Sequence, residues 1–352
     1  MAARGALDSI GPDAAEKIDS IYFGNVQQTT TDCAYMARHV GLKAGVPQDR
    51  PALTVNRLCG SGFEALVQGV KEIQMGESEM VLTGGAESMS RAPYTLHNTR
   101  WGSPLGVNLN LVDSLWEGLT DLHINCPMST TAENLATKFG VNKEAADKWA
   151  VTSQARWAAA NKAGVFKREI VHIEVKDKKT KQLVSFEVDE HPRPTSDFAA
   201  LQKLKPLFLQ NGTVSAGNAS GICDGAAAVI VASEAAVKKH KLKPLARVVS
   251  YASVGVPPEI MGYGPVPAYK LALKRAGLTV NDMDQYEINE AFASQLVVCM
   301  NELKLDPAKL NVDGGAIAMG HPTGASGARI IGHLALEMKR KSLKYAIGGA
   351  SS

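Results

Sequence analysis

The sequence predicts an α/β protein with parallel sheets covered by helices on both faces, and two observations support this class. Short apolar or β-branched runs alternate with segments in which apolar residues recur at helical spacing. The composition is that of an ordinary folded protein, with 45% hydrophobic and 21% charged residues, which excludes disordered and fibrous classes. At roughly 150 residues per domain, 352 residues make two or three folding units.

The first strand and helix unit lies between residues 52 and 85. We expect a strand over Ala52–Val55, a turn of small residues, and then a helix with one apolar face made by Phe63, Leu66, Val70 and Ile73. Met80–Thr83 is predicted to be the next buried strand, ended by Gly84 and Gly85.

The second half of the chain repeats this alternation. A strand over Ala226–Val231 leads into a helix over residues 234–240, and another helix covers residues 291–303. Residues 314–318 are then expected as a strand, followed by a Gly-rich turn and a helix with an apolar face made by Ile330, Leu334 and Met338.

Residues 92–218 differ in character and are predicted to be an insertion or lid rather than a further layered sheet. This segment contains all four tryptophans, a long helical stretch over Thr131–Ala163 and a charged hairpin over Ile170–Val188. Its HPRPTSD sequence, with Pro192 and Pro194, is typical of a loop.

Charge and cysteine content exclude several classes of function. The net charge of +3 is too small for a typical nucleic-acid binder, and no apolar run reaches the ~18 residues of a membrane-spanning helix. Five cysteines without a CxxC pair argue against a disulfide framework or a zinc ribbon and favour a reducing compartment. The N-terminal residues lack the apolar core of a secretory signal, and Asp8 and Asp13 argue against a mitochondrial transit peptide.

The segment Asn56–Gly62, with the sequence NRLCGSG, holds the first candidate for chemistry. A cysteine at a helix N-terminus is near the positive end of the helix dipole, so the Cys59 thiolate should be favoured below the free pKa of about 8.5. Gly60 and Gly62 would let backbone N–H groups approach an acyl oxygen. The alternative is a small buried cysteine at a tight turn.

Three further segments are weaker candidates alone. His321 lies in a Gly-rich loop between the strand expected over 314–318 and the helix that follows it. It could accept a thiol proton or stabilise an oxyanion, and the alternative is a structural histidine. Asn289 could orient a water or donate to an oxyanion, or cap a helix, and Glu290 could be only a first-turn charge. Residues 216–221 could form a flat wall for a slender ligand or a tight turn before a strand.

Taken together, the segments NRLCGSG, GGAESMS, AGNASG, NEAF and GGAIAMGHPTGASG resemble, in this order and spacing, the thiolase family. The similarity is greatest to the mitochondrial type of 3-ketoacyl-CoA thiolase and extends over essentially the whole chain. It implies the thiolase fold, in which two similar βαβαβ-type layered halves (αβαβα) carry an inserted loop domain. The implied division is 1–91 with 219–241 for the N-terminal half, 92–218 for the loop domain over coenzyme A, and 242–352 for the C-terminal half.

The resemblance also implies roles for residues. Cys59 matches the nucleophile that becomes a thioester, and His321 matches the histidine that activates it and, with a water held by Asn289, stabilises the thioester oxygen. Arg193 is a possible phosphate contact, and Pro127 stands where short-chain thiolases typically carry a histidine, which favours a degradative enzyme of broader chain-length tolerance. The positions that match the pantetheine tunnel are Leu119, Met128, Phe208, Ala216, Ser220, Met261 and Phe292.

Two departures from the family pattern stand out. The first strand with most of the first helix, and the closing strand, have no counterpart here, so we hypothesise a shortened chain. Ser351 occupies the position of the family's second catalytic cysteine, the base toward coenzyme A or the acetyl α-carbon. A hydroxyl has a much higher pKa than a thiol, and the loss of a positioned acid–base group typically costs ~10²–10⁴ in rate. Turnover is therefore expected to be impaired.

The activity that the resemblance implies is that of an acetyl-CoA C-acyltransferase of fatty acid β-oxidation. It cleaves 3-ketoacyl-CoA to acetyl-CoA and a shortened acyl-CoA through an acyl-cysteine, reversibly and without metal or prosthetic group. One alternative is a catalytically impaired acyl-CoA-binding protein, and another is a relative of β-ketoacyl synthases. The expected partners are acyl-CoA, coenzyme A and further copies in a homodimer or homotetramer, and the expected location is the mitochondrial matrix, with the cytoplasm as the alternative.

Overall fold

The computed structural model describes residues 1–352 and is built around a four-stranded sheet. The strand order is β10–β3–β1–β2, formed by Asp224–Ala232, Met80–Ser88, Ser20–Gly24 and Ala52–Val55. β1 is parallel to both β2 and β3, whereas β10 is antiparallel to β3. The α/β class is confirmed, but the expectation of wholly parallel sheets is wrong for β10.

Strand β3 is longer than the sequence indicated. It continues through Gly84 and Gly85 to Ser88, because β10 pairs with it over nine residues, from Met80 opposite Ala232 to Ser88 opposite Asp224. The prediction that the two glycines end this strand is therefore wrong.

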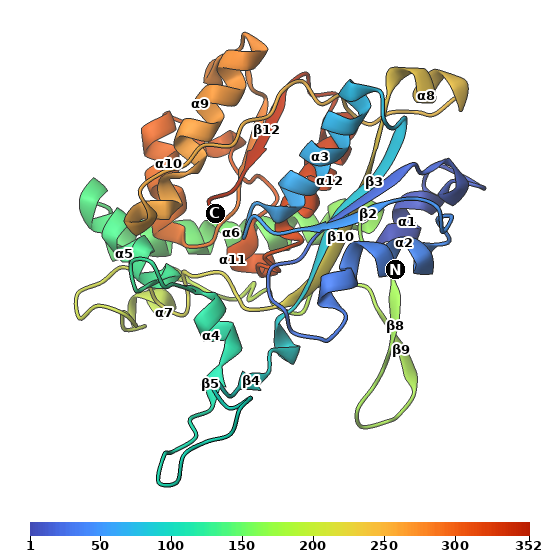
Figure 1. The fold of residues 1–352 in the computed structure, drawn as a ribbon. Helices are drawn as coiled ribbons and strands as arrows, with labels where there is room; N and C mark the ends of the chain where they lie inside the picture. The colour runs from blue at the N-terminus through green and yellow to red at the C-terminus, as the bar shows by residue number, and fades with distance from the viewer.

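Helices cover both faces of this sheet (Figure 1). α3 (Ser61–Met75) and α12 (Ser326–Lys341) pack against each other on one face. α1 (Ala2–Asp8) lies against β10, and α2 (Met36–Ala44) lies against β1 and β2. The core between the sheet and α1 and α2 includes the buried side chains of Leu7, Ile21, Phe23, Met80 and Leu82. α8 (Glu234–Lys239) follows β10 as predicted.

The C-terminal part contains a second, smaller sheet. β11 (Gln285–Ile288) is parallel to β12 (Ala346–Gly349), and α9 (Pro265–Ala276) and α10 (Ala293–Leu303) pack beside them. Residues 316–319 form the short helix α11 (Ala316–Met319), so the expected strand over 314–318 is wrong. The largest core of the molecule lies here and includes Tyr269, Ile288 and Leu296.

The segment 92–218 contains helices and short hairpins but no large sheet. The expected helix over Thr131–Ala163 is two helices, α5 (Met128–Phe139) and α6 (Lys143–Lys162), because Gly140 ends the first with φ of +67°. The charged hairpin is confirmed as β8 and β9, which project from the body with the β4 and β5 region (Figure 1). The remaining elements of the segment are β4 (Tyr94–Thr95), β5 (Val112–Asp113), α4 (Ser114–Gly118), β6 (Thr120–Asp121), β7 (Cys126–Pro127), β8 (Ile173–Lys176), β9 (Leu183–Phe186) and α7 (Phe198–Gln202).

Short 3-10 turns link these elements: η1 (Ala15–Lys17), η2 (Cys33–Tyr35), η3 (Met89–Arg91), η4 (Val165–Arg168), η5 (Pro258–Tyr263), η6 (Val280–Asp282) and η7 (Pro307–Lys309). None of the helices is both long and apolar enough to cross a bilayer. The division of the chain at residues 91, 218 and 241 stays a prediction.

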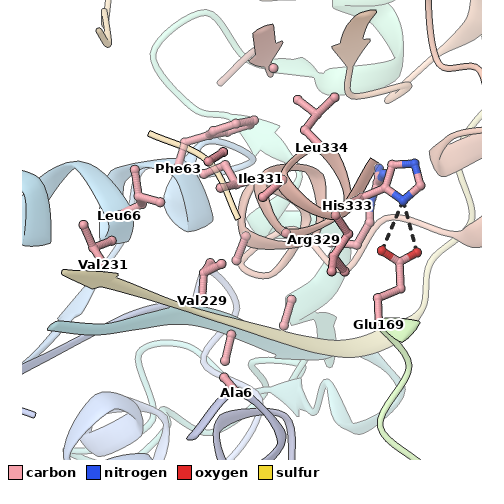
Figure 2. Close-up of a pocket in the computed structure, with 18 of the residues that line it drawn as sticks. Ala6, Phe63, Leu66, Glu169, Val229, Val231, Arg329, Ile331, His333 and Leu334 are labelled. Carbon is pink, nitrogen blue, oxygen red and sulfur yellow. Dashed lines mark hydrogen bonds and ion pairs between the residues drawn. The ribbon is translucent and has the colours of Figure 1, made fainter. Parts of the chain in front are cut away.

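A cavity of 2780 Å³ borders β10, β12, α3 and α12. Figure 2 shows its apolar lining from three of these elements, with Phe63 and Leu66 on α3, Val229 and Val231 on β10, and Ile331 and Leu334 on α12. At one end of the cavity, His333 of α12 pairs with Glu169 from the inserted segment. Cys59 does not line this cavity, although its neighbours Arg57 and Gly60 do.

Candidate active site

Cys59 lies in a tight turn between β2 and α3. Leu58, immediately before it, has φ of +45°, a left-handed conformation that is uncommon for a residue other than glycine. Side chains hold the turn in this shape: the Asn56 side chain accepts the N–H of Leu58 at 3.0 Å. The Ser61 hydroxyl accepts the N–H of Arg57 at 2.8 Å and donates to the carbonyl of Leu58 at 2.6 Å. The sulfur is thus presented by a fixed backbone.

His321 lies in the loop between α11 and α12, rather than between a strand and a helix as the sequence suggested. Its N–H donates to the carbonyl of Gly221 at 3.0 Å, which ties the loop to the AGNASG segment. The helical conformation of 316–319 has a cause outside this segment, since the buried Glu290 carboxylate accepts the N–H of Ile317 at 3.1 Å.

The close approach of two helix N-termini brings Cys59 and His321 together. A Cβ on Gly62 of α3 would lie 2.4 Å from the backbone nitrogen of Ala328, and one on Gly327 of α12 would lie 2.3 Å from that of Phe63. Gly62 is therefore required for helix packing, and the approach of its N–H to an acyl oxygen stays a prediction. The result is a distance of 3.0 Å between Cys59 Sγ and His321 Nε2, across 262 residues of chain.

The hydrogen bonds around the imidazole fix its tautomer. The Ser326 hydroxyl has one proton, which it donates to the carbonyl of Pro322 at 3.2 Å. Its oxygen therefore accepts from Nδ1–H of His321 at 2.6 Å. Nε2 then has no proton, and its lone pair faces the Cys59 thiol at 3.0 Å and the Asn289 amide nitrogen at 3.3 Å. Sequence reasoning missed the role of Ser326, although the residue belongs to the GHPTGASG segment.

Asn289 completes the cluster and is not a helix cap. α10 begins at Ala293 with Phe292 as its N-cap, so the alternative of a capping asparagine is wrong. The Asn289 side-chain amide lies 3.3 Å from His321 Nε2, and its backbone N–H donates to the carbonyl of Gly349 in β12. Its buried Oδ1 has no hydrogen-bond partner.

Burial sets the protonation of the pair. Desolvation raises the pKa of Cys59 to about 12; its own backbone N–H lowers that pKa, while the Glu87 charge raises it further. Desolvation, with a contribution from Arg329, lowers the pKa of His321 to about 4. The thiolate expected from the helix dipole is therefore wrong for the resting site, because desolvation outweighs the dipole. The resting pair is a neutral thiol and a neutral imidazole.

Glu290 is far more than a first-turn charge. It is fully buried, and its carboxylate accepts hydrogen bonds from Trp149 Nε1 at 2.9 Å and from Ser153 Oγ at 2.7 Å, both on α6. It also accepts from Asn311 Nδ2 at 2.9 Å. Through this carboxylate, the inserted segment is bonded to the residue next to Asn289. In the sequence, only the charge of Glu290 indicated that it could have such partners.

Four of the seven predicted tunnel residues occur as two neighbouring pairs. The N–H of Met128 donates to the carbonyl of Leu119, and Ser220 lies beside Phe292 where Ala219 bridges to it. The Phe208 ring stacks on Trp116 with centroids 6.5 Å apart. Ala216 is exposed, Met261 is buried in η5, and Arg193 is exposed and donates its N–H to Gln154. Their contact with a ligand stays a prediction.

Ser351 lies in the interior at the end of the β12 strand. The residue is 0% exposed, and its hydroxyl oxygen has no hydrogen-bond partner. Its neighbour Ser352 reaches the Cys59 turn, since a Cβ on Gly60 would lie 3.4 Å from the Ser352 hydroxyl.

Two family models together match nearly the whole chain. The model for the N-terminal domain of thiolase matches residues 1–235, and the model for its C-terminal domain matches residues 242–351. The chain belongs to the thiolase family. Its similarity to curated thiolases is high: it is 55% identical to human mitochondrial 3-ketoacyl-CoA thiolase over 350 residues, which are 99% of this chain and 87% of the relative. It is 45% identical to a β-ketothiolase of Cupriavidus necator, covering 95% and 84% of the two chains.

Solved thiolase structures agree with this fold. The crystal structure of human mitochondrial 3-ketoacyl-CoA thiolase in complex with CoA superposes with a TM-score of 0.96 at 55% identity, covering 99% of this chain and 87% of that one. An acetyl-CoA acetyltransferase of Bacillus anthracis superposes with a TM-score of 0.94 at 39% identity, covering 99% and 89%. The thiolase fold predicted from the five segments is confirmed.

Proposed function

We propose that this thiolase is an acetyl-CoA C-acyltransferase that cleaves 3-ketoacyl-CoA with coenzyme A during fatty acid β-oxidation. The observation that supports this most directly is the 3.0 Å contact between Cys59 Sγ and His321 Nε2. A cysteine beside a neutral histidine whose other nitrogen is occupied is the arrangement that nucleophilic acyl transfer requires.

In the first half-reaction, the Cys59 thiol gives its proton to His321 Nε2 as the sulfur attacks the 3-keto carbon. The bond between the α- and β-carbons breaks, and the acyl group stays on Cys59 as a thioester. The α-carbon takes up one proton to give acetyl-CoA, which balances the proton that Cys59 gave to His321, and the imidazole is neutral again. In the second half-reaction the thiol of coenzyme A attacks that thioester, which yields the shortened acyl-CoA and restores the Cys59 thiol. The thiol and imidazole start neutral, so charge develops only as the reaction proceeds.

The same two side chains can stabilise the developing oxyanion. Once His321 holds the proton, its Nε2–H becomes a donor, and the Asn289 amide 3.3 Å away is a second donor in the same buried place. Donors fixed in a water-poor site stabilise a charged transition state more than the neutral ground state. The substrate thioester acidifies its own α-carbon, so this chemistry needs no metal or prosthetic group.

Acylation is tested by mixing the protein with acetoacetyl-CoA and following it by intact mass. We expect an acetyl adduct of about 42 Da on Cys59, released as acetyl-CoA when coenzyme A is added. The proposal fails if the protein forms no adduct and no acetyl-CoA appears.

We infer that Ser351 slows the second half-reaction most, because the thiol of coenzyme A must lose its proton there. A buried hydroxyl is a poor base at neutral pH, so we expect Ser351→Cys to raise turnover by ~10-fold or more while adduct formation changes little. Equal turnover of the two proteins would show that Ser351 does not limit the reaction. A persistent adduct with negligible turnover would favour the alternative function of an impaired acyl-CoA-binding protein.

We further propose a homo-oligomer in the mitochondrial matrix. Strand β2 is the outer strand of the large sheet, and its Leu53 side chain is 55% exposed. An unpaired outer strand with an exposed apolar residue is suited to pairing with a second copy. The mass in solution, measured by light scattering for the protein and for Leu53→Asp, tests this: a dimer or tetramer that the substitution weakens supports it, and a monomer in both cases contradicts it.

A further inference from the structure

The carboxylate of Glu87 collects more hydrogen bonds than its place in a strand would suggest. The residue is 3% exposed near the end of β3, in the GGAESMS segment, and it pairs with no lysine, arginine or histidine. Its two oxygens accept from Asn25 Nδ2 at 3.2 Å, the N–H of Val26 at 3.1 Å, the N–H of Gln27 at 2.9 Å, Thr323 Oγ1 at 2.7 Å and the N–H of Gly324 at 2.9 Å.

These five donors come from two loops that have no backbone hydrogen bond to each other. One loop follows β1, and the other is the loop that carries His321. The second loop rests directly on the sheet, since a Cβ on Gly85 would lie 1.8 Å from the carbonyl oxygen of Gly324. Glu87 therefore anchors the His321 loop at the residues two and three positions beyond the imidazole.

Only an ionised carboxylate fits this set of donors. It accepts on both oxygens and donates nothing, so all five partners can be donors at once. A carboxamide in the same place would direct its own N–H groups at two or more of them. Burying a charge is costly unless hydrogen bonds satisfy it. The Glu87 charge is satisfied by donors of two loops rather than by a cationic side chain, so its hydrogen bonds fix the loops.

We propose that Glu87 is a positioning residue for the acyl transfer, fixing the His321 loop so that Nε2 stays within reach of the Cys59 sulfur. This rests on the proposed function only in that the Cys59 and His321 pair is taken to be the reacting pair. The hydrogen bonds of Glu87 go to Asn25, Val26, Gln27, Thr323 and Gly324, and none goes to Cys59 or His321.

The alkylation rate of Cys59 by iodoacetamide distinguishes positioning from simple electrostatics. The negative charge of Glu87 disfavours the thiolate, so if charge were its only effect, Glu87→Gln would raise the alkylation rate at neutral pH. If Glu87 positions His321, the variant loses proton transfer to the imidazole, and the rate falls. We expect a fall of ~10-fold or more at pH 7, with a similar fall in kcat and less than about a threefold change in KM.

Alkylation needs no acyl-CoA, so it separates this proposal from the proposed function. If wild-type Cys59 is alkylated quickly but never acylated by acetoacetyl-CoA, the proposed function fails while the role of Glu87 is still measured. The matched control is Glu72→Gln on α3, whose carboxylate accepts from the hydroxyls of Ser20 and Ser78 and contacts neither loop. We expect both of its rates to stay within about twofold of wild type.

Two milder variants keep the test decisive if Glu87→Gln does not fold. Thr323→Val removes one of the five donors, whereas Thr323→Ser keeps the hydroxyl. We expect slower alkylation in the valine variant, by roughly threefold or more, and rescue in the serine variant. An unchanged or faster alkylation in folded Glu87→Gln overturns the proposal, as do equal rates for the valine and serine variants.

Discussion

Two regions of the molecule each bury a histidine to a similar depth, but one histidine is neutral and the other is positively charged. His321, in the loop before α12, is 7% exposed, and His333, in the middle of α12, is 3% exposed. Burial lowers the pKa of His321 to about 4, so it is neutral at pH 7. The pKa of His333 is instead raised to about 10, because its carboxylate neighbours outweigh the same burial.

The partners explain the contrast. His321 faces a thiol, an amide and a hydroxyl, none of which is charged. Around His333, Nδ1 lies 3.1 Å from both carboxylate oxygens of Glu169, while Nε2 lies 3.3 Å from Asp313 and 3.9 Å from Glu287 (Figure 2 shows the pair with Glu169). Desolvation favours the neutral form until opposite charges reverse it. A neutral imidazole can accept a proton during catalysis, whereas the charged one joins the inserted segment to α12.

The largest effect on turnover is expected from removing the Cys59 sulfur, which lies beside the neutral His321. Cys59→Ala should abolish the acyl adduct and lower turnover by more than about 10⁴-fold, since no other group replaces the nucleophile. Intact-mass measurement with acetoacetyl-CoA and an acetyl-CoA assay check this. Cys33→Ala, at a cysteine with no contact to the site, is the control and should keep the adduct. An adduct that survives in Cys59→Ala would place the nucleophile elsewhere.

Removing the imidazole should have the next largest effect. His321→Gln keeps a polar side chain of similar size that cannot accept the thiol proton. We expect turnover to fall by ~10²–10⁴-fold, the range for a positioned acid–base group, and alkylation of Cys59 to slow as well. Steady-state kinetics and iodoacetamide labelling measure both. Normal alkylation with lost turnover would mean that His321 acts only on the oxyanion.

Much of the fold could be predicted because the spacing of apolar residues in a strand or a helix is a local feature of the sequence. β2, α3, α8, α10 and α12 all appear close to where periodicity placed them. The failures have long-range causes: β3 runs on through Gly84 and Gly85 because β10 pairs with it, and 316–319 is helical because Glu290 holds it. Neither cause can be seen in a short window of sequence.

That Cys59, His321 and Asn289 lie close together was likewise predictable, while their environment was not. Each of Cys59, His321 and Asn289 could be explained locally as a structural residue. Only the resemblance of five segments, in their order and spacing, to the thiolase family linked the three. The pKa of Cys59 was predicted in the wrong direction, since a helix dipole is a local feature and burial is not. Glu87 and Glu290 make hydrogen bonds across the fold, which leave no pattern in the sequence. Ser326 bonds His321 only five residues away, yet the sequence does not show that contact either.

Removing the charged imidazole of His333 should lower the free energy of unfolding rather than the rate of acyl transfer. His333→Gln leaves three carboxylates without their central cation, and removing one partner of a buried ion pair typically costs ~3–5 kcal/mol. Denaturant unfolding at pH 7 measures it, and the acylation rate per folded molecule should change only a few-fold. The control is His97→Gln, whose histidine pairs with Glu117 at 3.1 Å in an exposed position. That substitution should cost no more than about 1 kcal/mol, and equal losses would contradict the comparison.

The smallest effect, a pH dependence of stability, should have opposite signs for the two histidines. The folded pKa of His333, about 10, is above the unfolded value of about 6.5. Its contribution is therefore complete below pH 6.5 and is lost as the pH rises toward 10. The folded pKa of His321, about 4, is below the unfolded value, so its contribution is present above pH 6.5 and is lost as the pH falls toward 4.

Each of these losses has a slope of at most about 1.4 kcal/mol per pH unit, the value for a single proton. Unfolding free energies measured from pH 4.5 to 9.5 should therefore fall at both ends. His333→Gln should flatten the alkaline side alone and His321→Gln the acid side alone; if either substitution altered both sides equally, the two regions would not be electrostatically independent.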